Sequence, residues 1–331
     1  MMDSDALALP PQTGPMLLRR RATRKAGLGA GPPHLLIPQP LPRWVSLFHA
    51  PEPKSGQGGA QPVTDAAFAA GAAVFALDQM IRAAPPWLGC LVLRQALRSA
   101  SVAARLLRLN ADEAALRDAL HLTRPGDDPG PAGRLHALLR QLTLRPTRLA
   151  EAMLEVIASE IEGAAASAEV LALLRADIAL AQRLEWERPL PLHLTLILDP
   201  ALRKGVSGQR PNATGADWTQ HRHPVLGRAA VAVYGQAVDL ARRAEALSVA
   251  ASTLRTRDGG GGLSLILADD SVAPWRMAQL QAGLGRRVGE TSSGQQGLGS
   301  DRAARRLCES LHALGSLRLL TDRPTFRLYG L

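Results

Sequence analysis

Apolar and polar positions repeat with a helical period along most of the chain, and this pattern predicts a mainly α protein. In the first predicted helix, alanine and glycine surround Phe68 and Phe75 on most sides, which indicates a helix buried in the core. Turns that contain proline and glycine separate the helices, so we expect a multi-helix orthogonal bundle. The predicted helices cover about residues 64–84, 87–109, 111–122, 131–144, 148–162, 168–187, 192–198, 224–255 and 272–281, the last of which pairs with the terminal helix.

The hydrophobic period changes near the C-terminus. A helix is predicted over about residues 300–314, with Ser300 as its N-cap and Gly315 as the glycine that ends it. After Gly315 the period becomes two, which indicates two short strands joined by a turn that contains Asp322 and Pro324. One face of this hairpin carries Leu317, Leu319, Phe326 and Leu328, and the other carries Arg318, Arg327 and Tyr329. A helix followed by a hairpin is the closing half of a winged helix-turn-helix.

Composition divides the chain into three parts. Residues 1–62 are rich in proline, glycine and glutamine, which predicts a disordered basic extension. Residues 63–258 form the predicted α-helical body, and the glycines at 259–262 are expected to end its last helix. Residues 263–331 form the predicted winged-helix-like domain. The stretch at 282–299 departs from an ordinary helix-turn-helix, because it is longer than the usual turn of three or four residues.

The terminal helix and hairpin carry the candidate nucleic-acid-binding residues. Three arginines lie on the helix face opposite Leu307 and Leu311, and we expect them to enter a DNA groove. The three arginines of the hairpin are expected near phosphates. The six candidates are Arg302, Arg305 and Arg306 on the helix, and Arg318, Arg323 and Arg327 on the hairpin. The same arginines can form a solvated face of a protein-binding module, so this alternative stays open.

Net charge is +10, and the surplus of basic residues lies mostly at the two ends of the chain. Residues 1–62 hold seven basic and three acidic residues, and residues 283–331 hold eight and four. The residues between them hold 24 basic and 22 acidic residues, so the middle is nearly balanced. Basic ends favour acidic partners, of which nucleic acid is the first candidate.

Cysteine content and hydropathy indicate a compartment. Cys90 and Cys308 lie on separate predicted helices and in no C-x-x-C pair, so we expect buried free thiols in a reducing environment. No run approaches 18 apolar residues, and the basic residues at 19–21 are not followed by the apolar core of a secretory signal. We therefore expect a cytoplasmic protein with no membrane contact.

Motifs that would indicate catalysis are missing from the sequence. There is no G-x-S-x-G, no H-E-x-x-H, no Walker A and no dinucleotide-binding fingerprint. The loop at 124–134 has glycine and arginine near a helix start, but Asp127 and Asp128 would repel phosphate, so a rigid connector is the preferred interpretation. His221 and His223 are expected in a loop without a third metal ligand. We predict no catalytic residue, metal or cofactor; the sequence assigns no small-molecule ligand.

Five segments of the sequence resemble a bacterial family known as domain of unknown function 1403. The resemblance covers about residues 65–331. It is carried by Ala66–Asp78, Asp112–Leu120, Arg124–Arg134, Trp186–Leu192 and Arg323–Leu331. The resemblance implies no catalytic residue or ligand. It implies DNA-related work, because the family is similar to groups encoded near plasmid replication and segregation functions.

These observations leave three functions open, the third of which is an enzyme that uses the loop at 124–134 or the loop with His221 and His223. The first is a non-enzymatic, DNA-associated protein that contacts DNA through its C-terminal winged helix. The alternative is an adaptor in a protein assembly of the plasmid maintenance or segregation type, in which the winged helix binds a protein. Salt distinguishes the first two, because phosphate contacts weaken steeply between about 50 and 200 mM salt, whereas a stable protein interface of at least about 1,000 Å² survives.

Overall fold

The computed structural model of this chain is mainly helical, as the sequence predicts. It describes residues 38–48, 63–124, 126–203, 209–254, 259–287, 300–321, 323 and 326–331. The α-helices are α1 (Arg43–Phe48), α2 (Val63–Arg82), α3 (Leu88–Leu106), α4 (Glu113–Leu122), α5 (Gly130–Leu144), α6 (Ala150–Glu160), α7 (Ser167–Arg183), α8 (His193–Leu196), α9 (Trp218–Thr253), α10 (Gly259–Ala268), α11 (Pro274–Arg287) and α12 (Asp301–Ala313). The short elements are the 3-10 turns η1 (Thr147–Leu149) and η2 (Pro200–Leu202) and the strands β1 (Arg318–Leu319) and β2 (Tyr329–Gly330).

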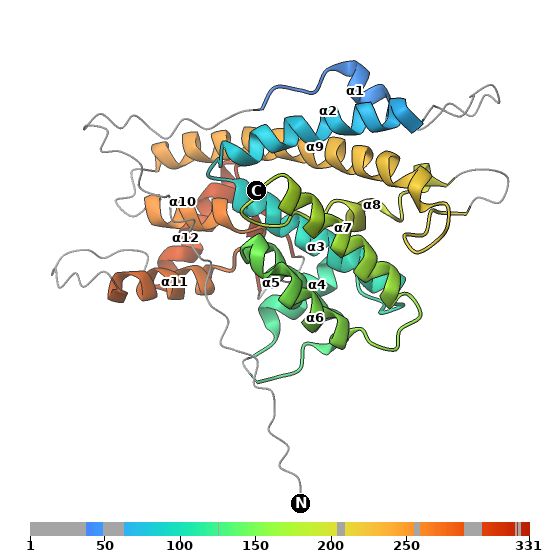
Figure 1. Ribbon diagram of the computed structural model, residues 1–331. Coiled ribbons are helices and arrows are strands. Elements are labelled where there is room, and N and C mark those ends of the chain that lie inside the picture. The colour runs from blue at the N-terminus through green and yellow to red at the C-terminus, as the bar shows by residue number, and fades with distance from the viewer. Residues whose placement is uncertain are drawn as a thin grey trace, which may run out of the picture.

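The helices form layers around α3 (Figure 1). The two longest helices, α2 and α9, pack side by side along one edge of the molecule, and α1 lies on the outer side of α2. Helix α3 crosses the centre and packs against α5, α4 and α8. Helices α10, α11 and α12 lie together below one end of α9 in the view of Figure 1, and α10 contacts both α3 and α9. The C-terminal helices are therefore attached to the body through α3 and α9.

Two hydrophobic clusters make up the core. One joins the second half of α3 to α4–α8 and includes Leu97, Leu139 and Ile178. The other joins α2, the first half of α3 and α9, and it continues into the C-terminal residues Leu311 and Tyr329. Residues on both sides of position 263 thus share one core.

The first predicted core helix is only partly buried. Phe68 and Phe75 are 69% and 65% exposed, so the prediction that α2 buries them is wrong. The buried positions of α2 are mostly small residues such as Ala69 and Ala73, which allow α9 to approach closely, and the aromatic rings are left on the outer face. Trp44 of α1 stacks on Phe68 with ring centroids 5.7 Å apart.

Most of the predicted disordered extension, at 1–37 and 49–62, lies outside the described residues. Its described part contains α1, in which Val45 is buried. The hydroxyl of Tyr234 in α9 donates to the Gln39 carbonyl at 2.8 Å, which ties this segment to the body.

Two boundaries of the longest helix differ from prediction. Helix α9 begins at Trp218 and continues through Pro224, so His221 and His223 lie in a helix and not in a loop. Proline removes one N–H donor, and here that loss falls in the second turn of a 36-residue helix. The glycines at 259–262 do not end this helix, which stops at Thr253; they form the first turn of α10.

The two C-terminal strands form a small antiparallel sheet, which Val272 extends. β1 pairs antiparallel with β2, with Arg318 opposite Gly330 and Leu319 opposite Tyr329. On the other side of β2, Val272 exchanges main-chain hydrogen bonds with Tyr329 at 2.8 and 3.0 Å. The Tyr329 side chain is buried in the shared core, whereas the sequence places it on the outer face; Leu319 is 40% exposed.

Candidate nucleic-acid interface

Helix α12 begins and ends where the sequence predicts. The Ser300 hydroxyl accepts from the Ala303 N–H at 3.2 Å, so it caps the helix, and Asp301 lies in the first turn, where a negative charge suits the helix dipole. At the other end, Gly315 adopts a φ of 72°. The Gly315 and Ser316 N–H groups donate to the carbonyls of His312 and Leu311, which is the Schellman motif. These caps define the two ends of α12.

The core side of α12 is apolar, and its other side is basic. Ala304, Leu307, Cys308 and Leu311 are buried in the shared core. Because the helix repeats every 3.6 residues, its three arginines and Glu309 are left exposed on the opposite side. Leu314 follows Leu311 at helical spacing but is 53% exposed, because it lies at the helix end.

All six predicted DNA-contacting arginines are exposed. Within the described residues, three of them form no ion pair: Arg302, Arg306 and Arg318. Arg302 and Arg306 lie one turn apart on α12, and Arg318 begins β1. These three guanidinium groups are free to meet a partner.

The other three candidate arginines contact carboxylates. Arg305 pairs with Asp301 at 2.9 Å, one turn back along α12. Arg327 reaches Glu309 at 3.3 Å, which links the hairpin to α12. Arg323 pairs with Asp118 of α4 at 2.7 Å, and so it joins the hairpin to the body. Each of these arginine side chains is about half exposed, and ion pairs in such positions stabilise a fold by only about 0.2–1 kcal/mol.

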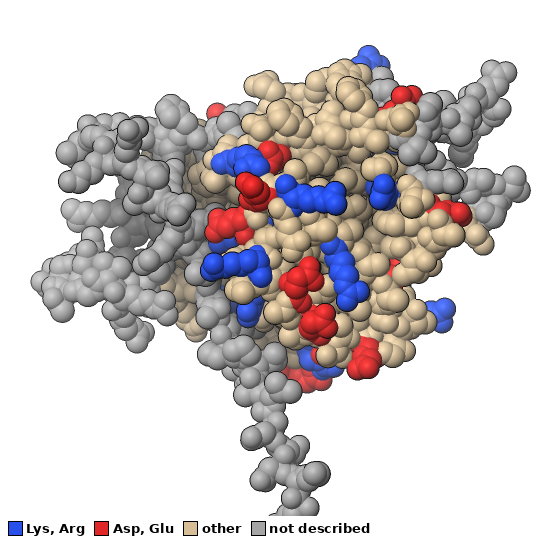
Figure 2. All heavy atoms as spheres, viewed as in Figure 1, with Lys and Arg blue, Asp and Glu red and all other residues tan. Residues whose placement is uncertain are grey.

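The face of the body that lies over α5, α6 and α7 has mixed charge. Figure 2 shows basic and acidic side chains interspersed on it, without a continuous patch of one sign. Arg134 is an example, because it bridges Asp128 and Glu160 at 2.5 and 2.8 Å. Asp128 also accepts from the Gly130 N–H at 2.9 Å, so the loop at 124–134 is closed by its own ion pair and hydrogen bonds. This geometry supports the connector interpretation of the loop.

A buried ion-pair fork attaches the C-terminal helices to the body. Arg140 of α5 donates to Asp269 at 2.7 Å and to Asp270 at 3.0 Å, and both aspartates follow the end of α10. The three side chains are 12%, 14% and 3% exposed. Burial opposes the charge on Arg140, but the two carboxylates outweigh it and raise the pKa of the guanidinium. The sequence does not reveal this fork, because no local spacing links Arg140 to residues 129 and 130 positions away.

Two neutral histidines lie beside the fork. His121 Nε2 is 2.9 Å from the Ser271 hydroxyl, and His136 Nδ1 donates to the Leu116 carbonyl at 3.3 Å. Burial, aided by nearby Arg276, lowers the pKa of His121 to about 3. Burial, aided by Arg140, lowers the pKa of His136 to about 3 as well. Both imidazoles are therefore uncharged near neutral pH.

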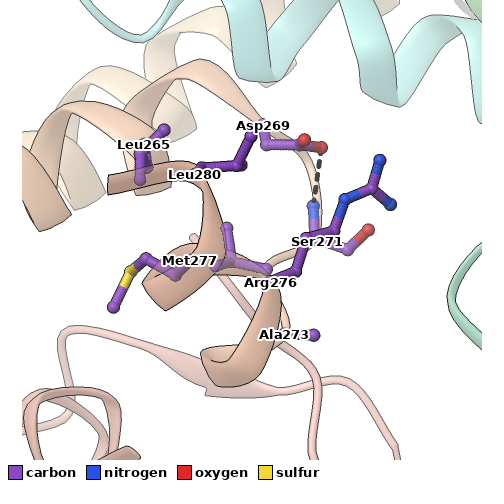
Figure 3. Close-up of a pocket in the computed structure, with 8 residues that line it drawn as sticks. Leu265, Asp269, Ser271, Ala273, Arg276, Met277 and Leu280 are labelled. Atoms are coloured by element: carbon purple, nitrogen blue, oxygen red, sulfur yellow. Dashed lines mark hydrogen bonds between the residues drawn. The ribbon is translucent and has the colours of Figure 1, made fainter. Parts of the chain in front are cut away.

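The hollow beside Ser271 is too small for a substrate. Figure 3 shows Asp269, Ser271 and Arg276 with their polar groups to one side, while Met277 and Leu280 lie to the other. Its volume is about 10 Å³, which is about the space that one water molecule needs. A Ser–His contact in such a place holds two chain segments together and offers no room for acyl-transfer chemistry.

The remaining chemical candidates behave as ordinary structural groups. Cys90 and Cys308 are buried free thiols, and burial raises the pKa of each to about 12. In the part of the chain that the structure describes, no three His, Cys, Asp or Glu residues gather to hold a metal. None of the described helices combines the length and apolar character that a membrane span requires.

A protein-family model matches the chain over the whole of the described fold. The model of "Protein of unknown function (DUF1403)" matches residues 37–164 and 147–331, which together run from just before α1 to the end of β2. The chain belongs to this family, as the resemblance in its sequence indicates. No curated protein matches it. No solved structure matches it either.

Proposed function

We propose that residues 259–331 form a winged helix-turn-helix module that binds DNA through α12 and the hairpin. The element order supports this proposal: α10, the extended Val272, α11, α12, β1 and β2 follow one another as in winged helices. The strand order supports it too, because β2 lies between β1 and Val272. In such modules the second helix of the pair enters the major groove, and that helix here is α12.

The charge on the exposed side of α12 and the hairpin is the main argument for DNA. Among the described residues, six exposed arginines lie there beside the carboxylates of Asp301 and Glu309, while Asp118 of the body pairs with Arg323. Three of the arginines need no rearrangement to contact phosphates. The other three exchange a carboxylate for a phosphate; Asp301 and Glu309 are exposed and Asp118 is 27% exposed, so each exchange costs about 1 kcal/mol or less. The surface therefore suits the phosphate backbone.

Fluorescence anisotropy with labelled duplexes of unrelated sequence tests the proposal. Arg306→Ala removes one free guanidinium, and we expect the affinity to fall about tenfold on every duplex, because a hydrogen bond to a charged group contributes about 1.5 kcal/mol. Arg148→Ala is the matched control, since Arg148 is an exposed arginine of η1, far along the chain from the module. Equal affinities for both variants would remove α12 from the interface.

Exposed leucines favour a second candidate function, binding of a protein partner. Leu314 and Leu319 flank the turn between α12 and β1 and are 53% and 40% exposed. Apolar side chains at this position suit an adaptor whose module packs against another protein. A Leu314→Ser, Leu319→Ser variant separates the two functions. The DNA proposal predicts unchanged affinity for duplexes, whereas an adaptor loses a salt-resistant protein complex and shows no duplex binding at all.

A further inference from the structure

The central helix of the body, α3, carries three arginines and no acidic residue (Figure 1). Arg94, Arg98 and Arg105 share one face of this helix with Ser101, because they recur at helical spacing. The positions of α3 away from this face are mostly buried, whereas Arg98 is partly exposed and Arg105 is exposed. Arg108, in the turn after the helix, is exposed as well. We call Arg98, Arg105 and Arg108 the α3 strip.

The carboxylates that follow α3 along the chain lie in or beside α4, and each of them already has a partner. Asp112 caps the start of α4 by accepting from a backbone N–H at 2.8 Å. Glu113 pairs with Arg117 at 3.3 Å, and Asp118 pairs with Arg323 of the hairpin at 2.7 Å. Within the described residues, the side chains of the three arginines of the α3 strip form no ion pair and no hydrogen bond. Their guanidinium groups are therefore available to a partner.

The α3 strip begins where the C-terminal hairpin ends. Arg94 donates from Nη2 to the main-chain oxygen of Leu331 at 3.0 Å. The residue before Leu331 is Gly330, which lies opposite Arg318 in the sheet. Arg98 follows Arg94 by one turn of α3. The unpaired Arg318 of the hairpin and the unpaired Arg98 of the body are thus separated by one strand and one helical turn.

A row of unpaired arginines on a helix without carboxylates attracts a polyanion. Arg98 and Arg105 are seven residues apart, which is about 10 Å along a helix and corresponds to about three base pairs of duplex DNA. We propose that the α3 strip binds the phosphate backbone of the same DNA duplex that α12 and the hairpin contact. This inference rests on the proposed function. It extends the DNA contact from the C-terminal module onto the body of the protein.

The salt dependence of DNA binding tests the inference, measured by fluorescence anisotropy of the full chain with a duplex of about 20 base pairs, which is two helical turns. The strip variant combines Arg98→Gln, Arg105→Gln and Arg108→Gln. Its slope of log affinity against log salt is expected to be smaller than that of the wild type by about 2.7, because each lost phosphate contact contributes about 0.9. The matched control keeps the wild-type slope. It combines Arg145→Gln, Arg148→Gln and Arg183→Gln, at exposed arginines of the body.

A smaller variant guards against loss of folding, since Arg98 is partly buried. Arg105→Gln with Arg108→Gln changes only exposed side chains and is expected to lower the slope by about 1.8, while thermal unfolding checks that each variant stays folded.

Additivity tests whether one duplex meets both surfaces. The strip variant combined with Arg302→Ala, Arg306→Ala and Arg318→Ala is expected to lower the slope by about 5.4, because contacts to different phosphates of one duplex add. The inference is overturned if the folded strip variants keep the wild-type slope while the variant of α12 and the hairpin lowers it. Saturation at two duplexes per chain overturns it too. A wild-type chain that binds no duplex overturns the DNA function together with this extension.

Discussion

At the level of single residues, the clearest backbone requirement lies at Gly315. Its φ of 72° is strained for any residue with a Cβ, and this conformation permits the Schellman hydrogen bonds that end α12. We expect Gly315→Ala to lower the free energy of unfolding by about 1–2 kcal/mol, as measured by urea denaturation.

A substitution at Gly71 is expected to change the free energy of unfolding in the opposite direction, as measured by the same urea denaturation. Gly71 lies inside α2, where an added Cβ meets open space. Gly71→Ala should therefore raise stability by about 0.5–1 kcal/mol, because alanine favours the helix. If both substitutions shift stability in the same direction, the backbone geometry assigned to Gly315 is wrong.

At the level of elements, the Arg140 fork links α5 of the body to the two aspartates that follow α10. Arg140→Leu leaves Asp269 and Asp270 buried without their cation. Removing one partner of a buried ion pair costs about 3–5 kcal/mol, so we expect a loss of that size in urea denaturation. Arg148→Leu, at an exposed position, should change stability by no more than about 0.5 kcal/mol. Equal effects of the two substitutions would contradict the fork.

The two buried histidines beside the fork should make stability depend on pH. Their pKa values are about 3 in the folded chain and about 6.5 when unfolded, so below pH 6.5 only the unfolded state takes up protons. Stability is then fully present above pH 6.5 and falls as the pH drops toward 3. At pH 5 each histidine should cost about 2 kcal/mol.

Thermal unfolding between pH 7 and 5 measures this dependence. The variant His136→Gln should flatten the decline, although it loses some stability at pH 7, while His221→Gln outside the cluster should leave the slope unchanged. An identical slope in wild type and His136→Gln would show that His136 is not held neutral by burial.

At the level of the whole molecule, local patterns predicted most of the helices. The helical spacing of apolar residues and the caps at Ser300 and Gly315 were sufficient to predict α12, because those signals depend on neighbours in sequence. The same reasoning failed for Phe68 and Phe75. Their burial depended on which face of α2 meets α9, and small residues satisfied that contact better than aromatic rings.

The candidate interface was predictable only in part. The sequence indicated which arginines share the exposed side of α12. It did not reveal that Arg323 reaches Asp118 in α4, or that Arg140 reaches Asp269 and Asp270, since those pairs join residues 205, 129 and 130 positions apart. Long-range pairs of this kind depend on how helices pack, and no local spacing predicts them.

The salt dependence of DNA binding tests the central proposal most directly, because each neutralised phosphate contributes about 0.9 to the slope of log affinity against log salt. Combining Arg302→Ala, Arg306→Ala and Arg318→Ala should reduce that slope by nearly 3. The control combines Arg145→Ala, Arg148→Ala and Arg183→Ala, at exposed arginines of the body, and should keep the wild-type slope. A slope that is equal in the two triple variants, or a wild-type chain that binds no duplex at low salt, would contradict the account.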